Sequence, residues 1–324
     1  MARTDMQSLV SILIPVHNAG QTIAAAIDSC LAQTYPHIEI LLLDNASSDG
    51  SLDIMAAYDS LKISILKNEK AGTIAESRNK LLHHARGEYI AWLDADDTMH
   101  PDRIDIQVGF MTSNPGTDIA GSWILTDAPD LPLRKLPLLH SQIRTLLWFK
   151  NCMIQPSVIS KNFYRRENIW YDESYGNSVE DYELWYRLVS RKKFANIPQF
   201  LTSYHMTTGE ALKRKKESND FHKNLSRLWN KKWEDAHIQV EAADRRIFQD
   251  FLYTNATLSP AESQSLHRTL ALLKRSDRDP FFRLVVSFHQ LRLWKNMPLL
   301  QKIRHAGLLA NLAYYFKIKR NYLF

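Results

Sequence analysis

The stretch that decides the fold is Gly87-Glu88-Tyr89-Ile90-Ala91-Trp92-Leu93-Asp94-Ala95-Asp96-Asp97. Its apolar run, Tyr89 to Leu93, is typical of a short buried strand, and three carboxylates follow within four residues. Like charges this close repel each other, so the strand end needs a cation or hydrogen-bond donors to compensate them. Ligands of α/β sheets bind at the carboxyl ends of the strands. We therefore predict a divalent metal that carries a phosphorylated ligand, and oxygen ligands of this kind suit magnesium or manganese.

The chain around this stretch alternates between apolar strands and helical patterns. Leu9 to Val16 is nearly all apolar, as expected of a strand covered on both faces, and Ile38 to Leu43 repeats the pattern. Further strands are predicted over residues 63–66, 119–125 and 199–206, and helices over residues 21–33, 51–58, 74–85, 101–114, 140–150 and 180–189. Residues 126–137 hold three prolines and are predicted to form an irregular loop. This order predicts an α/β fold with a mostly parallel sheet flanked by helices.

The composition is that of a globular protein, with 45% hydrophobic and 23% charged residues in a chain of 324. The two cysteines offer neither a disulfide framework nor a metal-ligand spacing, which favours a reducing cytoplasm. The N-terminus lacks the apolar region of a signal peptide, and no stretch approaches the roughly 18 consecutive apolar residues of a membrane span. We therefore expect a cytoplasmic chain that does not cross the bilayer.

The charge divides the chain into two parts. Residues 1–210 hold 19 Lys and Arg against 25 Asp and Glu, a net charge of −6, whereas residues 211–324 hold 22 against 10, a net charge of +12. The length also suggests two domains at about 150 residues each. We predict a catalytic domain over residues 1–210 and a basic α-helical C-terminal domain over residues 211–324.

Several motifs, taken in order, resemble those of the family 2 glycosyltransferases of the GT-A type. They are Val10–Asn18, Gln33–Tyr35, Glu39–Asp49, Ala75–Asn79, Gly87–Asp97 and Glu180–Trp185, and together they cover about residues 8–206. The resemblance implies a GT-A, Rossmann-like fold with a nucleotide-sugar half over about residues 1–125 and an acceptor half over about 126–210. It also implies an inverting enzyme that uses Mn²⁺ or Mg²⁺ to transfer a sugar from a nucleotide-sugar, with UDP as the expected carrier, to a hydroxyl.

The resemblance assigns the strand-end carboxylates to the donor. Asp96 would hold the metal on the diphosphate, directly or through water, and Asp97 would support the metal or the donor sugar. Asp94 would bind the ribose or orient the loop. The alternative is that Asp94, Asp96 and Asp97 form a solvated acidic turn.

Other donor contacts are implied on neighbouring segments. Asp44 would accept a hydrogen bond from the base, or it would only form an N-cap or Asx turn for the following helix. Pro15 and His17 lie on the first strand-to-helix turn, where His17 replaces the usual tyrosine and would stack on the base. The family's second acidic residue is Asn45 here. Arg78 would pair with phosphate oxygens or with a strand-end carboxylate.

The acceptor side centres on Glu180 and Asp181. The resemblance makes Asp181 the general base that removes the acceptor proton, and Glu180 the residue that orients the acceptor. The alternative is that both carboxylates only stabilise a helix N-terminus. His205, near the end of the last predicted strand, is implied as a contact to the metal or to phosphate.

The C-terminal tail carries a separate signal. Residues 281–324 hold eight Lys and Arg and no Asp or Glu, and apolar and aromatic residues alternate with them. Basic amphipathic helices of this kind suit an anionic membrane surface, at about 1 kcal/mol per basic residue. The tail would then hold the protein on the inner face of the cytoplasmic membrane. The alternative is a helical cap on the catalytic domain; nucleic acid is not expected as a partner, because the acidic catalytic part opposes it.

The resemblance thus implies an enzyme that adds one sugar per encounter to a glycan or lipid-linked acceptor in cell-surface polysaccharide biosynthesis. Processive relatives carry membrane helices and a Gln-x-x-Arg-Trp motif, and neither occurs here. Two other classes stay open. A nucleotidyltransferase-like enzyme would also place aspartates on a metal, although no Gly-rich phosphate loop is present. A non-catalytic binding subunit would keep the fold without the reaction.

Overall fold

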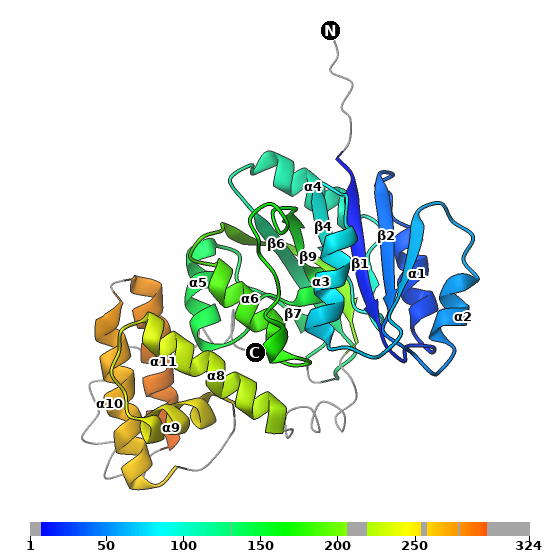
Figure 1. The fold of residues 1–324 in the computed structure, drawn as a ribbon. Coiled ribbons are helices and arrows are strands. Elements are labelled where there is room, and N and C mark those ends of the chain that lie inside the picture. The colour runs from blue at the N-terminus through cyan, green and yellow to red at the C-terminus, as the bar shows by residue number, and fades with distance from the viewer. Residues whose placement is uncertain (1–7, 130, 206–218, 254–257, 278, 297–324) are drawn as a thin grey trace. The chain divides into compact units, whose positions relative to one another are not determined.

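The computed structural model describes residues 8–129, 131–205, 219–253, 258–277 and 279–296, whose fold is drawn in Figure 1. The chain divides into two compact units. The first unit is drawn from residues 1–140 and 152–214, and the second from residues 141–151 and 215–324. The segment 141–151 therefore belongs with the C-terminal residues, although the order of the chain places it inside the first unit.

Four parallel strands form one half of the sheet in the first unit. In spatial order they are β3 (Ile63–Lys67), β2 (Ile38–Asp44), β1 (Val10–Val16) and β4 (Tyr89–Trp92). Parallel neighbours need crossover connections, which are α1 (Ile23–Leu31), α2 (Ser51–Ala56) and α3 (Ile74–His84). Every residue of β1, β2 and β4 is buried, as the apolar runs predict for strands covered on both faces.

The other half of the sheet is mixed. It continues from β4 through β8 (Ile159–Lys161), β6 (Ile119–Thr126), β9 (Phe194–Tyr204) and β5 (Thr98–Met99), and β7 (Leu133–Arg134) pairs with β6. β6 and β9 are parallel, whereas the other pairs are antiparallel. This half also contains α4 (Arg103–Ser113), α6 (Glu180–Leu188) and the short 3₁₀ turns η1 (Gln155–Ser157) and η2 (Glu173–Tyr175).

The structure adds strands that the sequence pattern does not reveal. β5, β7 and β8 are only two or three residues long, too short to show a period of two, and β7 lies inside the predicted irregular loop. β9 begins at Phe194 rather than at Gln199. Its pairing with β6 shifts register at Ser122 and Trp123, and such irregularities break the alternation of apolar and polar residues.

A buried carboxylate, Glu39 on β2, ties β1 to the start of β4. Ser11 Oγ donates to it at 2.6 Å, and Arg86 donates from its main-chain N at 2.8 Å and from its guanidinium at 2.7 and 2.9 Å. Burial raises the pKa of Glu39, but these hydrogen bonds outweigh burial and lower it below its ordinary value. A Cβ at Gly87 would lie 2.5 Å from Ser11 N, so only glycine fits at the start of the carboxylate-bearing stretch.

The second unit is helical. It contains α5 (His140–Phe149, from Ser141 on), α8 (Asn219–Asp235), α9 (Ala242–Tyr253), α10 (Pro260–Ser276) and α11 (Pro280–Asn296). Trp148 of α5 lies at its centre, edge-on to Trp229, Trp233 and Phe248, with ring centroids 5.0, 5.1 and 6.1 Å away. Aromatic rings prefer such edge-to-face contacts, so this cluster forms the core that holds α5 against α8 and α9.

A buried lysine completes this core. Lys232 Nζ donates to the carbonyl oxygens of Leu147 and Trp148 at 3.0 and 3.2 Å and lies 4.5 Å from the Trp229 ring centroid. The last carbonyls of a helix lack partners inside the helix and carry partial negative charge. Lys232 therefore caps the C-terminal end of α5 from inside the unit.

In the described ranges, no helix combines the length and the apolar character needed to span a bilayer. Residues 297–324, which hold much of the basic tail that we predicted to bind a membrane, lie outside the described residues.

Candidate active site

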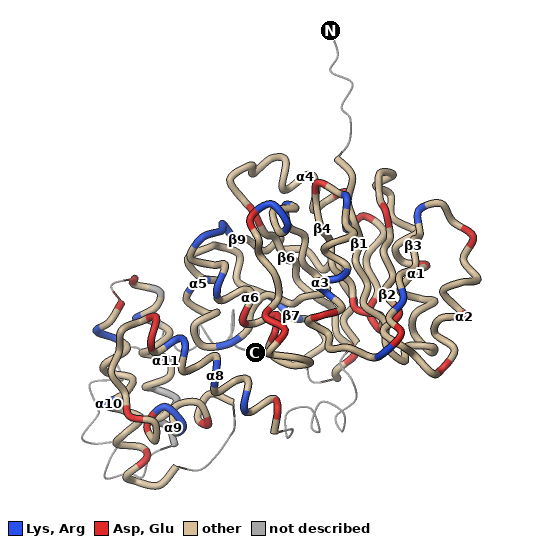
Figure 2. Tube along the Cα trace, viewed as in Figure 1, with Lys and Arg blue, Asp and Glu red and all other residues tan. Residues whose placement is uncertain are grey.

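The carboxyl ends of β1, β2 and β4 meet at one edge of the sheet because these strands are parallel. Asp44 ends β2 opposite Val16 of β1, and Asp94 comes two residues after the end of β4. Figure 2 shows acidic residues, in red, gathered where β1 and β2 end. The sheet therefore brings carboxylates from two distant segments to the same edge.

Arg78 of α3 joins this edge to the N-terminus of α6. Its guanidinium lies 2.5 Å from Glu180 Oε1 and 3.4 Å from Asp94 Oδ1, and the three side chains are 6%, 8% and 28% exposed, respectively. The guanidinium also lies 5.9 and 5.6 Å from the ring centroids of Trp92 and Tyr171. Burial alone would lower the pKa of Arg78, but Glu180 and Asp94 raise it above its ordinary value, so the cation is firmly held.

Asp97 is the most buried of the three strand-end carboxylates. Its Oδ1 accepts a hydrogen bond from the main-chain N of His205 at 2.7 Å, whereas its buried Oδ2 has no hydrogen-bond partner among the described residues. Burial and the neighbouring Asp94 raise the pKa of Asp97 to about 9. Asp96, one residue earlier, is exposed. The raised pKa means that burial and the neighbouring carboxylates oppose negative charge on Asp97, and a cation at this strand end would relieve that repulsion.

These donors fit a divalent cation shared with a ligand. The Oδ2 atom of Asp97 lacks a partner, and nearby Asp94 and Asp96 add carboxylate oxygens, the hard ligands that Mg²⁺ and Mn²⁺ prefer. No group of three or more Asp, Glu, His or Cys residues in the described part of the chain is already arranged around a metal position. A cation that also binds phosphate oxygens needs only one or two protein carboxylates.

His205 approaches this cluster through its main chain. Its imidazole Nδ1 lies 2.6 Å from Asp127 Oδ2, and both side chains are partly exposed. The main-chain N of His205, and not the ring, contacts Asp97. The predicted metal residue is therefore beside the carboxylate cluster, with its ring oriented by Asp127.

A cavity of about 500 Å³ lies beside the ends of β1 and β2. Its volume is within the usual range of small-molecule sites. Its lining residues are Pro15, Val16, His17, Asn45, Ala71, Gly72, Thr73, Ile74, Glu76, Ser77 and Asn177. The cavity thus contains Pro15 and His17, two of the residues predicted to contact the nucleotide.

Asn45 shapes one wall of this cavity. Its Oδ1 accepts from the main-chain N of Gly72 at 2.9 Å, and its Nδ2 donates to the carbonyl oxygen of Gly72 at 2.8 Å. A carboxylate could not donate the second bond, so an amide suits this position. Asp44, next to it, is buried and accepts from the main-chain N of Ser47 at 3.3 and 3.4 Å in a local turn, which is the alternative role predicted for it.

The N-terminus of α6 carries Glu180, Asp181 and Glu183 in its first turn. The residue before it, Val179, has a φ of 70° and is buried. The left-handed region is costly for a β-branched residue, and such strain is typical of functional sites. Val179 therefore sets the direction in which α6 presents its acidic first turn.

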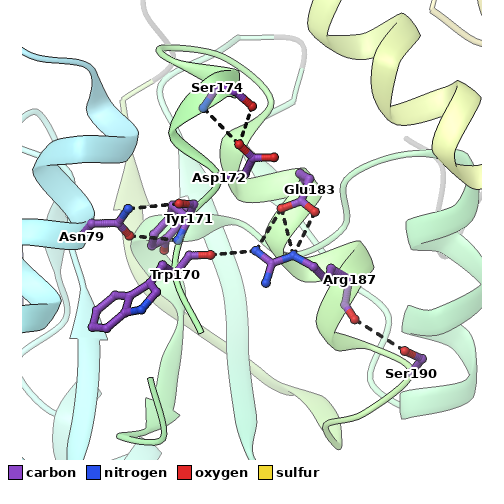
Figure 3. A network of polar contacts seen from close by, with 8 residues as sticks. All are labelled: Asn79, Trp170, Tyr171, Asp172, Ser174, Glu183, Arg187 and Ser190. Atoms are coloured by element: carbon purple, nitrogen blue, oxygen red, sulfur yellow. Dashed lines mark hydrogen bonds and ion pairs between the residues drawn. The ribbon is translucent and has the colours of Figure 1, made fainter. Parts of the chain in front are cut away.

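A polar network supports this arrangement (Figure 3). Asn79, next to Arg78 on α3, accepts from the main-chain N of Tyr171 at 2.9 Å and donates to its carbonyl oxygen at 3.0 Å. Arg187 of α6 donates to the carbonyl oxygen of Trp170 at 2.7 Å and pairs with Glu183. The segment containing Trp170 and Tyr171 is thus bonded to both helices, which fixes α3 and α6 relative to each other.

Comparison with known proteins identifies the family of this chain. The model of glycosyl transferase family 2 matches residues 11–171. The Escherichia coli UDP-Glc:alpha-D-GlcNAc-diphosphoundecaprenol beta-1,3-glucosyltransferase WfaP is 31% identical over 198 residues, which are 61% of this chain and 76% of WfaP. The chain belongs to glycosyl transferase family 2. In several other curated family relatives, the aligned part spans only 42–44% of the relative's length.

Solved structures agree with this family at the level of the fold. S. aureus TarS 1–349, in its complex with UDP-GlcNAc, superimposes with a TM-score of 0.59 at 16% identity, over 97% of this chain and 92% of that one. The mannosyltransferase PcManGT from Pyrobaculum calidifontis, in complex with GDP-Man and Mn²⁺, gives a TM-score of 0.56 at 16% identity, over 97% and 87% of the two chains. The predicted GT-A fold is confirmed.

One residue of this family 2 chain escaped the sequence analysis. Tyr204, at the end of β9, is largely buried, and burial together with four carboxylates raises the pKa of its hydroxyl. The carboxylates are Asp94, Asp97, Asp181 and Asp96, in order of effect. Tyr204 is thus coupled to both acidic centres, and the main chain of the next residue, His205, contacts Asp97. The only signal in the sequence is its position beside His205, because a tyrosine in a strand is ordinarily a packing residue.

Proposed function

We propose that this chain is an inverting, metal-dependent glycosyltransferase that moves one sugar from a nucleotide-sugar, with UDP as the expected carrier, to a hydroxyl of an acceptor. The observation that carries the proposal is the buried bridge of Arg78 to Asp94 and Glu180. This bridge couples a strand-end carboxylate cluster, suited to a diphosphate and its cation, to a second acidic centre on α6. A transferase needs both, one for the leaving group and one for the nucleophile.

On the donor side, the nucleotide is proposed to occupy the cavity beside Pro15 and His17, with Asp44 contacting the base. Asp96 would hold the cation with help from Asp97 and His205, and Asp94 would bind the ribose. Arg78 is engaged by two carboxylates, so we assign it to positioning them and not to the phosphates. A bound cation would neutralise the charge that develops on the leaving diphosphate.

On the acceptor side, Asp181 is proposed as the general base. Glu180 is nearly buried and held 2.5 Å from Arg78, so its carboxylate is fixed in place and oriented. Asp181 is only half buried and acts electrostatically on Tyr171 and Tyr204. The acceptor oxygen would attack the anomeric carbon and form the new C–O bond. The bond to the diphosphate oxygen would break, its electron pair would leave with the diphosphate, and the hydroxyl proton would pass to Asp181.

The acceptor is proposed to be a glycan or a lipid-linked sugar in cell-surface polysaccharide assembly. WfaP supports this class because its name gives a sugar linked to diphosphoundecaprenol as the acceptor. An activity assay with a panel of acceptors, with and without a lipid-linked phosphate, separates the two acceptor classes.

The central test compares Asp181→Asn with Glu183→Gln. Glu183→Gln is the control in the same turn of α6, because the Glu183 carboxylate pairs with Arg187 and is not expected to accept the acceptor proton. We expect Asp181→Asn to lower transfer by about 10²- to 10⁴-fold, the usual contribution of a general base. It should leave the stabilisation by UDP and Mn²⁺ in a thermal-shift assay unchanged. A panel of nucleotide-sugars in the same assay would name the donor. Full transfer by Asp181→Asn would refute the assignment of the base.

The metal has its own test. EDTA should abolish turnover, and Asp96→Ala should raise the Mn²⁺ concentration needed to protect the chain thermally in the presence of UDP. Turnover that resists EDTA and is unaffected by Asp96→Ala would contradict the proposed metal role.

Peripheral membrane binding is proposed for the basic tail. The described apolar side chains of α11, Phe282, Val285, Val286 and Leu293, are buried inside the second unit, so the membrane contact would come from residues 297–324. The test replaces Lys317, Lys319 and Arg320 with glutamine in the full chain. Sedimentation with anionic vesicles should fall, and sedimentation with zwitterionic vesicles should be low for both proteins. Equal sedimentation of both chains with anionic vesicles would refute the membrane contact.

A further inference from the structure

Arg134 on β7 is placed on the side of the sheet that faces the site. It pairs with Ile124 of β6, and Ile124 pairs with Thr202 of β9. Residues directly opposite each other share a face, and so do residues two apart on one strand. Arg134 therefore shares a face with Tyr204, the residue whose hydroxyl pKa is raised by the site carboxylates.

The two faces of these strands differ sharply in exposure. Ile124 and Thr202 are fully buried, on the face of Arg134. On the opposite face, Leu125 and Leu133 are 39% and 52% exposed, and Ser203 is exposed as well. Arg134 is thus directed to the inner side of the sheet while keeping part of its surface accessible to solvent.

The charge of Arg134 has no counter-ion in the described part of the chain. The two fully buried arginines of this unit are satisfied: Arg78 pairs with carboxylates, and Arg103 donates to the carbonyl oxygens of Pro156 and Trp92 at 2.6 and 3.0 Å. No ion pair or hydrogen bond of the Arg134 guanidinium occurs within the described ranges. Burial lowers the pKa of Arg134, and only Tyr204 and Cys152 offset it. A guanidinium stays charged under these conditions and gains from an anion.

The surroundings of Arg134 indicate which anion it faces. Arg134 shares a face with Tyr204 through the strand register. Among the described residues it forms no ion pair with a strand-end carboxylate, unlike Arg78. The donor diphosphate is already assigned to the strand-end cluster and its cation. An anion bound by Arg134 would then belong to the other substrate, the acceptor.

We propose that Arg134 binds a phosphate group of the acceptor and so selects acceptors whose reacting sugar is linked to phosphate. This inference rests on the proposed function and names the acceptor chemistry of the same site. The planar guanidinium matches two phosphate oxygens with parallel N–H donors. Tyr204 then separates the anion of the acceptor from the carboxylates that hold the donor.

The test measures binding to the full chain by calorimetry with UDP and Mg²⁺ at saturation, so that the donor phosphate site is filled. The probes are octyl phosphate, which mimics a lipid-linked phosphate, and inorganic phosphate. We expect Arg134→Gln to weaken octyl phosphate binding by about 10- to 100-fold, the usual effect of losing hydrogen bonds to a charged group. Arg134→Lys should recover part of the affinity, and circular dichroism should show that both variants fold.

Lys135→Gln is the matched control. It removes the same charge from the next residue, whose exposed side chain lies over the Trp123 ring at 5.1 Å. It should leave the binding of octyl phosphate unchanged. An equal loss in Lys135→Gln would show a general charge effect and overturn the proposal.

The remaining outcomes are also decisive. Loss of inorganic phosphate binding together with octyl phosphate binding would support a phosphate site whose ligand need not carry a lipid. No binding of either probe to the unmodified chain, or unchanged binding in Arg134→Gln, would overturn the proposal. An equal weakening of UDP binding in Arg134→Gln would assign Arg134 to the donor instead. Failure of the unmodified chain to bind UDP would count against the proposed function itself.

Discussion

Replacing Arg78 with methionine is expected to destabilise the first unit strongly. Methionine fills a similar volume but carries no charge, so Glu180 would be left without its closest counter-ion. The two side chains are 6% and 8% exposed, which means that water cannot take over the role of the guanidinium. Asp94 loses less, because it is 28% exposed and lies farther away, at 3.4 Å.

The expected loss in free energy of unfolding is about 3–5 kcal/mol, the usual cost of removing one partner from a buried ion pair. The exposed pair of Arg166 and Glu167 offers a matched control, since 76% of the Arg166 side chain is exposed. Arg166→Met should cost less than about 1 kcal/mol. The difference between the two variants isolates the effect of burial from the effect of losing an arginine.

The assay is unfolding in urea, monitored by hydrogen exchange in peptides that cover α3 and α6. This readout reports on the first unit alone. A double-mutant cycle with Glu180→Gln completes it. The sum of the losses in free energy of unfolding of the two single variants should exceed the loss of the double variant by about 1–3 kcal/mol, since the pair interacts directly. A loss below 1 kcal/mol in Arg78→Met, or strictly additive losses, would refute the view that this pair joins α3 to α6.

Three further predictions concern other parts of the chain. Val179 has a φ of 70°, so Val179→Gly should be more stable than Val179→Ala by about 1 kcal/mol. This order is the reverse of that in ordinary helical backbone. Thermal unfolding that shows the alanine variant to be more stable would mean that the strain is absent. Lys232→Met should cost about 1–3 kcal/mol in urea unfolding because it leaves the end of α5 uncapped, whereas Lys231→Met should cost little. The hydrogen bonds of Glu39 lower its pKa below the ordinary 4.5, so its stabilising effect is present above pH 4.5 and is lost as the pH falls through its folded-state pKa. The stability gap between the unmodified chain and Glu39→Gln should therefore shrink between pH 7 and pH 3, and a gap independent of pH, or an equal trend in exposed Glu69→Gln, would contradict this.

The parallel half of the sheet could be predicted from the sequence because its signals are local. β1 and β2 are continuous apolar runs, and buried strands of parallel sheets have this composition. The start of α10 has a local signal of the same kind, because Ser259 precedes Pro260 and forms a capping box with Glu262. In both cases, adjacent residues carry the information.

The second half of the sheet and the membership of α5 could not be predicted in this way. β7 and β8 are too short to show a period, and they exist because they pair with β6 and β4. The sequence of α5 shows an apolar face but not the neighbour against which that face packs. Its place in the second unit depends on Trp148, whose ring packs among aromatic residues that follow much later in the chain.

The stretch Gly87–Asp97 by itself determined that a buried strand ends in a cluster of carboxylates, and a resemblance carried by its neighbours determined the family. The tertiary structure decided what these carboxylates meet. It placed Arg78 between Asp94 and Glu180 and left Asp97 with an unsatisfied oxygen. It also brought Tyr204 near enough for the carboxylates to raise the pKa of its hydroxyl. The physical reason is that charge and burial along one strand are local properties, whereas a contact between residues about a hundred positions apart depends on strand register and helix packing.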